Sequence, residues 1–141
     1  MPNNINELIK YSEASINLEE LDNSDLPNTK IVYEYRDASN YKTNDEVVLA
    51  GKIDHELLSK MLAKLQGGMF FIPGQVGLPD IQNKMGDWNE DDHPFHSFLI
   101  IQPTSEDPTE GMPTIYELVA SFPDVWDATY IPSFADDNPS L

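Results

Sequence analysis

Two of the three histidines in this sequence lie in one short acidic stretch, EDDHPFH, at residues 90–96. His93 and His96 are three positions apart, and Asp92 directly precedes the first of them. Two imidazoles and a carboxylate can bind zinc, nickel or iron, and a carboxylate beside an imidazole also suits general-base chemistry. The candidate catalytic residues and the candidate metal ligands are therefore the same three: Asp92, His93 and His96.

The same stretch also has an ordinary interpretation as a surface loop. Pro94 disfavours a helical conformation at His93, so the two rings need not share a face. The helical H-E-x-x-H motif of zinc proteases is absent. We therefore expect a loop in which Asp92 caps backbone amides and a histidine pairs with a carboxylate. A metal site and acid–base chemistry remain the two alternatives for this stretch.

The second candidate segment is YRDASNYK at residues 35–42, which contains the only arginine of the chain, Arg36. A guanidinium can hold a carboxylate or a phosphate in a two-pronged grip. The alternative, which we favour, is that Arg36 pairs with Asp37 or Asp92 while Asp37 and Asn40 close a turn. The candidate contacts to a partner or anion in this segment are Arg36, Asp37, Asn40, Tyr41 and Lys42.

The third segment, FIPGQVGLP at residues 71–79, is a loop punctuated by proline and glycine. Its glycines do not follow the phosphate-binding patterns of nucleotide sites, and the chain has none of the common serine-nucleophile motifs. We interpret the segment as a rigid connector that presents Gln75 to a partner, and we expect no cofactor.

These three segments together resemble a set of small bacterial proteins of unassigned function. Those proteins carry Y-R-D-A-x-N-Y-K early, Q-V-G-x-P in the middle and D-D-H-x-x-H late, and the match covers about residues 31–98. The chain departs from this pattern at Gly74 and Ser97, where such proteins commonly carry an acid. The resemblance implies that the three segments belong to one shared surface, and it implies no activity.

The charge balance of the chain is strongly acidic, with 25 acidic residues, eight basic ones and a net charge of −17. Residues 85–141 hold 12 of the acids and none of the bases. Such a surface repels phosphate backbones and anionic membranes but attracts a basic protein. We therefore expect a basic protein partner, no direct nucleic-acid binding and no membrane binding. The alternative is that the charge serves solubility alone.

Length and composition predict a folded cytoplasmic protein. A chain of 141 residues with 40% hydrophobic content is long enough for one domain with its own core. It has no cysteine, so disulfides and thiolate chemistry are excluded. The N-terminal residues lack the pattern of a signal peptide and no apolar stretch reaches membrane-spanning length, so we expect an intracellular protein.

The elements that must position these segments follow from hydrophobic periodicity. Alternating residues at 30–36 and the Val47–Leu49 core of the segment EVVLAG predict a β-hairpin, and the short apolar runs at 69–72 and 98–101 predict further strands. Asp54 can cap a helix that buries Leu57, Leu58, Met61, Leu62 and Leu65. A capping box, Thr114 with Glu117, begins a second helix that Pro123 ends. The fold class expected is α+β, a single layered domain with a mostly antiparallel sheet and helices packed on one face.

Three parts of the chain are distinguished by composition. Residues 1–30 are predicted to form an N-terminal helical arm, residues 31–123 the α+β core domain, and residues 124–141 an acidic aromatic tail docked at Trp126. Trp88 and Trp126 are the candidate aromatic anchors for a partner.

The function that these features favour is that of an acidic, non-enzymatic interaction protein. An inhibitor, an immunity-type antagonist or an accessory subunit docking on a basic protein fits the charge. One alternative is a small metal-binding or hydrolytic domain that uses Asp92, His93 and His96, with Arg36 holding an anionic substrate. The other is a nucleic-acid mimic, which needs carboxylates spaced like phosphates over one face. The sequence thus leans against an enzyme without deciding the question.

Overall fold

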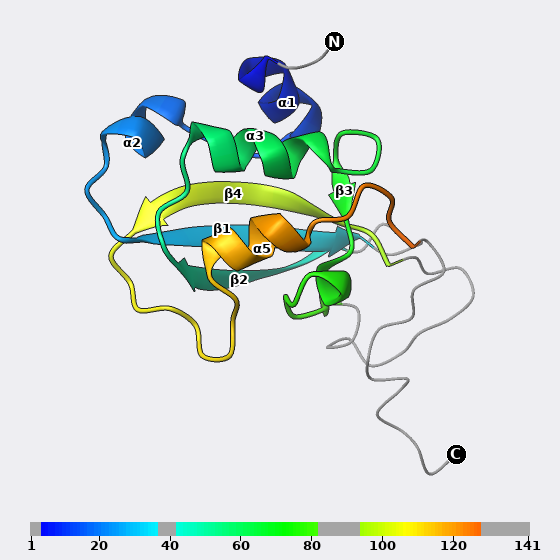
Figure 1. Cartoon of the computed structure of the whole chain (residues 1–141). Helices are drawn as coiled ribbons and strands as arrows, with labels where there is room; N and C mark the ends of the chain where they lie inside the picture. The colour runs from blue at the N-terminus through cyan, green and yellow to red at the C-terminus, as the bar shows by residue number, and fades with distance from the viewer. Residues whose placement is uncertain (1–3, 37–41, 82–93, 128–141) are drawn as a thin grey trace.

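The fold is a four-stranded antiparallel sheet with helices packed against it (Figure 1). The structure is a computed structural model that describes residues 4–36, 42–81 and 94–127. The strands are β1 (Asn28–Arg36), β2 (Lys42–Ala50), β3 (Phe70–Phe71) and β4 (His96–Thr104), in the spatial order β2-β1-β4-β3. This confirms the predicted α+β class and the antiparallel sheet.

The predicted hairpin is the centre of the sheet. Ile31, Tyr33 and Tyr35 are each 0% exposed, while the residues between them are only partly buried, so the alternation in the sequence does separate two faces. The hairpin extends to Asn28↔Ala50, beyond the alternating residues. Thr29 explains the extension: its hydroxyl donates to the Gly51 carbonyl at 2.9 Å and accepts from the Ile53 amide at 3.0 Å.

The two predicted helices are present and begin at their predicted caps. In α3 (His55–Ala63) the Asp54 side chain accepts a hydrogen bond from the Leu57 amide at 2.8 Å. In α5 (Ile115–Ser121) both bonds of the capping box form between Thr114 and Glu117. A short 3₁₀ turn, η1 (Pro73–Gln75), follows β3. These starts are local, so the sequence alone could locate them.

The N-terminal segment forms two helices and packs on the rest of the molecule. They are α1 (Ile5–Ser12) and α2 (Leu18–Asn23), and α2 was not predicted although the Asn17 side chain caps it by accepting from the Glu20 amide at 3.0 Å. Between the two helices the backbone of Ser15 bonds to β4 at Leu99 and Ile101. Leu8 and Leu21 lie in the same core cluster as the sheet residues.

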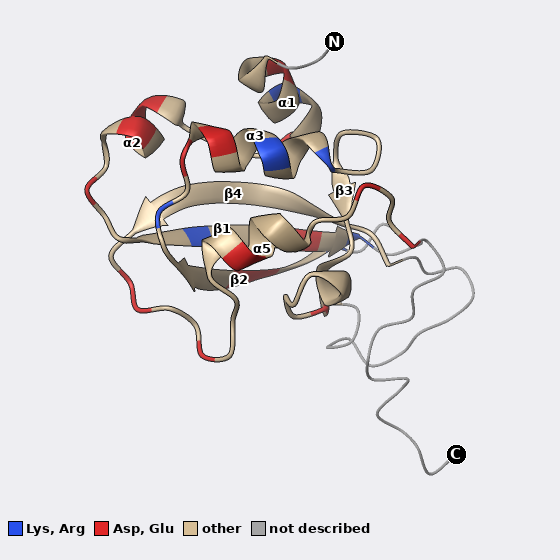
Figure 2. Cartoon of the chain, in the orientation of Figure 1, with Lys and Arg blue, Asp and Glu red and all other residues tan. Residues whose placement is uncertain are grey.

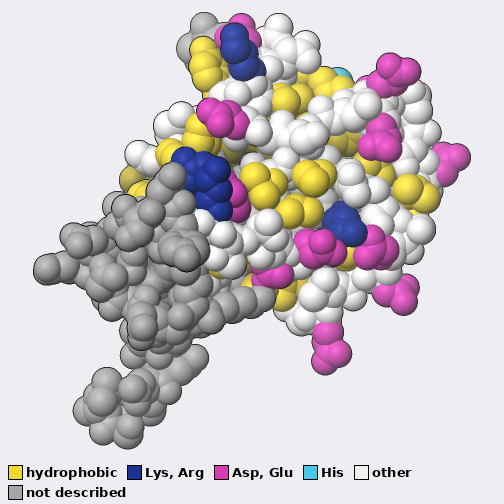
Figure 3. All heavy atoms as spheres, turned by 180° about the vertical axis from the view of Figure 1, so that it is seen from behind, with side chains coloured by type: hydrophobic (Ala, Val, Ile, Leu, Met, Phe, Trp, Pro, Cys, Tyr) yellow, Lys and Arg dark blue, Asp and Glu magenta, His cyan; other side chains and the backbone are white. Residues whose placement is uncertain are grey.

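The core lies between one face of the sheet and helices α3 and α5. Its fully buried members include Ile31, Leu49, Leu58, Met61, Phe98, Ile115 and Leu118. Each large side chain buried in this way contributes roughly 1.5–3 kcal/mol. None of the described helices α1, α2, α3 and α5 lies over the opposite face of the sheet, onto which Figure 3 looks; we call it the open face.

The segment around Trp126 packs on the domain, as predicted for the start of the C-terminal tail. Trp126 is 5% exposed, its indole nitrogen donates to the Lys64 carbonyl at 2.7 Å, and its ring meets Phe122 edge-on at 5.2 Å. No helix in the described ranges has the length and apolar character needed to cross a bilayer.

Candidate functional site

The strand register defines two rows of side chains at the end of the sheet where β4 begins. Phe71, His96, Tyr35 and Thr43 are directly paired across the four strands, as are their neighbours Phe70, Ser97, Glu34 and Asn44. Because successive side chains of a strand point to opposite faces, the first row faces the core and the second row lies on the open face. His96 and Ser97 therefore belong to different environments although they are adjacent in sequence.

His96 is a core residue in this structure. It is 1% exposed, and its ring lies among Tyr33, Tyr35 and Phe71 with centroid separations of 5.0–6.3 Å. Nε2 accepts a hydrogen bond from the Ile81 amide at 3.2 Å, and Nδ1 lies 2.9 Å from the Pro94 carbonyl. The two contacts together assign the neutral tautomer with the proton on Nδ1. Both ring nitrogens are thus engaged by backbone groups.

Residues 79–81 are held against this histidine by one further hydrogen bond. The Asp80 carboxylate is buried, with Oδ1 3.9 Å from His96 Nε2. The Tyr33 hydroxyl donates to the Pro79 carbonyl at 2.5 Å. Burial raises the pKa of Tyr33 above its ordinary value, and the charges of Asp45 and Asp80 raise it further. The hydrogen bonds from Tyr33 to the Pro79 carbonyl and from the Ile81 amide to His96 fasten residues 79–81 to the sheet.

The structure describes only some of the other predicted site residues. Asp37, Asn40, Tyr41, Trp88, Asp92 and His93 lie outside the described residues. Arg36 ends β1, and its guanidinium lies 3.7 Å from the carboxylate of Glu34. Lys42 is exposed opposite it in the hairpin.

Gln75 and Trp126 are placed together, on the side of the molecule where η1 meets the end of the described chain. The Gln75 side-chain oxygen accepts from the Asp127 amide at 3.3 Å. Trp126 itself is buried, so the structure places it in the core and not on an exposed contact surface. Within the described ranges, no group of three or more histidines and carboxylates could hold a metal ion.

A groove of about 490 Å³ lies on the open face beside the second row of side chains. Its lining includes Glu13, Glu34, Arg36, Phe70, Phe95 and Ser97. Two residues of the full lining, Arg36 and His96, were among the predicted site residues. The groove joins the end of α1, β3 and the start of β4, and these come together only through strand pairing, so the sequence carried no sign of it.

A second surface feature lies at the opposite end of the sheet, where α2 and the loops before β1, α3 and α5 meet (Figure 2). We call it the acidic end. It comprises Glu19, Glu20, Asp22, Asp25, Asp54, Glu56, Glu106, Asp107 and Glu110. Two lysines lie close to these segments: Lys52 donates to the Ser24 carbonyl, and Lys30 of β1 pairs with Glu46 at 3.4 Å and Glu106 at 2.7 Å. Asp22 lies 3.1 Å from His55, and Glu56 pairs with Lys60 at 3.4 Å.

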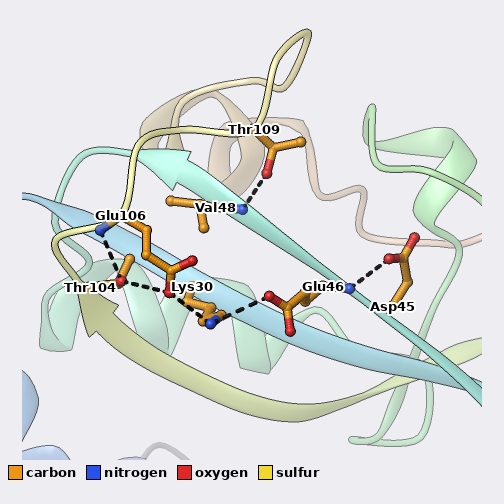
Figure 4. A network of polar contacts seen from close by, with 7 residues as sticks. All are labelled: Lys30, Asp45, Glu46, Val48, Thr104, Glu106 and Thr109. Atoms are coloured by element: carbon orange, nitrogen blue, oxygen red, sulfur yellow. Dashed lines mark hydrogen bonds and ion pairs between the residues drawn. The ribbon is translucent and has the colours of Figure 1, made fainter.

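The loop after β4 is fixed to the sheet by the contacts of Figure 4. Thr109 exchanges two hydrogen bonds with the backbone of Val48, and Glu106 bonds both Lys30 and Thr104. The hydrogen bond between Lys30 and Glu106 raises the pKa of the ammonium and lowers that of the carboxyl. The acids of this loop are thereby held at the acidic end.

Comparison of the chain with protein-family models, with curated proteins and with solved structures finds no match.

Proposed function

We propose that this protein is an acidic, non-enzymatic interaction protein, of the inhibitor, immunity-antagonist or accessory-subunit kind, that docks on a basic protein. The observation that carries the proposal is the acidic end, where nine acidic side chains accompany two lysines that are already engaged. All nine acids are exposed. Asp22, Glu56 and Glu106 lie beside basic side chains, so the other six supply most of the charge offered to a partner.

A concentrated negative surface of this kind acts mainly on association. It attracts a positively charged partner from beyond contact distance, raises the association rate and selects against acidic competitors. The attraction extends over about 10 Å at 0.1 M salt and shrinks as salt is added. Docking at the acidic end is therefore expected to weaken steeply with ionic strength.

The metal-binding or hydrolytic alternative finds less support in the described residues. His96 offers neither nitrogen to a metal or substrate, because the Ile81 amide and the Pro94 carbonyl engage both. A metal-binding or hydrolytic site would therefore need to use Asp92 and His93 without His96. Nucleic-acid mimicry is the remaining alternative, and the acidic end is the surface that would have to carry it, since the open face places Lys30 and Arg36 among its acids.

The test compares two triple variants that have the same net charge. In the first, Glu19→Gln, Asp107→Asn and Glu110→Gln neutralise three positions of the acidic end. In the second, Glu7→Gln, Asp124→Asn and Asp127→Asn neutralise three exposed acids elsewhere. Proteins of the source cell are captured on the immobilised wild type at low salt and eluted with increasing salt, and the affinity of the eluted partner is then measured for each variant.

We expect a basic partner whose affinity falls with salt and drops about tenfold in the first variant, since three peripheral charges contribute roughly 1.5 kcal/mol together. The second variant is expected to stay within about twofold of the wild type. Equal losses in the two variants, or binding that is insensitive to salt, would overturn the proposal. Competition of the partner by duplex DNA would identify the mimic instead.

A further inference from the structure

We propose that the groove on the open face receives an arginine side chain of the basic partner. This rests on the proposed function and deepens it, because it gives the partner a specific anchor in addition to the general attraction of the acidic end. The groove lies at the other end of the sheet from the acidic end, so one partner spanning the open face would contact both.

The shape of the groove follows from one small residue. Ser97 is paired with Phe70 on one side and with Glu34 on the other, so a serine side chain stands between two long ones on the same face. Directly paired side chains are about 5 Å apart, which leaves a hollow over the serine. Figure 3 shows hydrophobic side chains gathered on this face with charged groups beside them.

One wall of the groove is aromatic. Phe70 is 39% exposed although it belongs to a strand, and its ring lies 6.2 Å from that of Phe95 in a tilted arrangement. A guanidinium stacks on an aromatic face more favourably than an ammonium does, and the methylene groups of an arginine pack on apolar surface. This wall therefore favours arginine over lysine.

The charges of the groove favour a cation. Glu13 and Glu34 supply two carboxylates, against the single guanidinium of Arg36. The groove also lies at the C-terminal end of α1, where the helix dipole is negative. Arg36 and Glu34 are already in contact at 3.7 Å, but a carboxylate accepts several hydrogen bonds and can bind a second guanidinium.

Glu13, which lines the groove, has an unusual backbone conformation. Its φ is 60°, and within residues 4–36, 42–81 and 94–127 it is the only residue other than glycine with a positive φ. Glycine or asparagine normally takes this position after a helix, because a larger side chain is strained there. Strained backbone conformations cluster at binding sites, so the strain at a residue that lines a groove suggests that its side chain serves binding.

The experiment uses a blocked tripeptide, acetyl-Gly-Arg-Gly-amide, and its citrulline counterpart, which has the same shape without the charge. Each is titrated into the ¹⁵N-labelled full chain, and the backbone amides of Glu13, Phe70 and Ser97 are followed by NMR. We expect saturable shifts at these amides with a dissociation constant of about 1 mM for the arginine peptide, and at least about tenfold weaker binding of the citrulline peptide.

Three variants locate the binding. Glu34→Gln removes a carboxylate and is expected to weaken the arginine peptide about three- to tenfold, while Ser97→Leu fills the hollow and is expected to abolish saturable shifts. Glu13→Gly is expected to weaken binding while its denaturation midpoint is no lower than that of the wild type, because the strain is relieved. Glu7→Gln, an exposed acid of the same helix outside the groove, is the control and is expected to bind like the wild type.

Equal shifts with the citrulline peptide, or shifts confined to the acidic end, would overturn this inference. The same variants separate it from the proposed function. A captured partner that binds Glu34→Gln and Ser97→Leu as tightly as the wild type refutes the groove and leaves the acidic end intact. A groove that binds the arginine peptide while no salt-sensitive partner exists refutes the proposed function alone.

Discussion

At the scale of single residues, the polar groups inside the core are positioned by backbone partners. Tyr33 and His96 are both almost fully buried, yet each bonds to the main chain: Tyr33 to Pro79, and His96 to Ile81 and Pro94. A buried polar group without such a partner costs about 1–3 kcal/mol, so these bonds are required for the side chains to be buried at all. The histidine singled out by its acidic neighbours is therefore a structural residue.

The raised pKa of Tyr33 predicts how stability depends on alkaline pH. The unfolded state ionises this phenol near pH 10, whereas the folded state keeps it protonated to higher pH. The contribution of Tyr33 to the free energy of unfolding is thus fully present below pH 10 and is lost as the pH rises above it. The expected loss is roughly 1 kcal/mol per pH unit.

Urea unfolding of the wild type and of Tyr33→Phe between pH 8 and pH 11 measures this contribution. The stability advantage of the wild type is expected to shrink above pH 10, because phenylalanine does not ionise in either state. Tyr116→Phe, at a side chain that is 55% exposed, serves as the control and is expected to follow the pH dependence of the wild type. A constant difference between wild type and Tyr33→Phe across this range would contradict the assignment.

At the scale of elements, helices α1, α2, α3 and α5 each begin at a polar side chain that accepts a hydrogen bond from the first turn. Asn4, Asn17, Asp54 and Thr114 all do so. The caps at Asp54 and Thr114 were predicted as helix starts, and the one at Asn17 was overlooked because the short helix after it has little apolar periodicity. An N-cap side chain and the amide that it accepts from lie within three or four residues of each other, so helix starts of this kind can be predicted from the sequence.

Thr114→Ala tests the contribution of the capping box to α5. The hydroxyl that accepts from the Glu117 amide at 3.1 Å would be lost, and we expect the free energy of unfolding to fall by about 1 kcal/mol. Thr114→Ser keeps an acceptor in the same place and is expected to retain most of that stability. Chemical denaturation of the two variants decides the matter, and equal losses would mean that the side-chain oxygen is not the source of the effect.

At the scale of the whole molecule, the net charge of −17 opposes compactness. Like charges repel one another in the folded state more than in the expanded chain, and the few surface ion pairs offset little of this. The same charge that is proposed to attract a partner therefore lowers the stability of the isolated protein.

Added sodium chloride is accordingly expected to stabilise the protein while it weakens partner binding. Screening of the repulsion between about 20 and 300 mM salt should raise Tm by a few degrees, which corresponds to roughly 1 kcal/mol for a domain of this size. Thermal unfolding followed by circular dichroism measures it. A fall in Tm would instead show that attractive pairs such as Lys30 with Glu106 outweigh the repulsion.

The sequence by itself determined the fold class, the hairpin and the starts of α3 and α5. These depend on periodicity and on contacts between near neighbours, so the residues that cause them lie within a few positions of one another. The acidic character was equally a property of composition. The clustering of acidic residues at the acidic end could not be read from composition, because these acids come from four segments that only the fold brings together.

Only the tertiary structure showed that His96 is buried and that a groove lies beside Ser97 on the open face. Strand pairing turns His96 into the core and the adjacent Ser97 onto the open face, where it separates Phe70 from Glu34. Register between distant strands is set by the packing of the whole sheet, and a shift of one residue would exchange the two faces. The neighbours of a side chain across a sheet therefore do not appear in any local sequence pattern. For this reason the sequence pointed to the histidine beside its acidic neighbours but gave no sign of the groove.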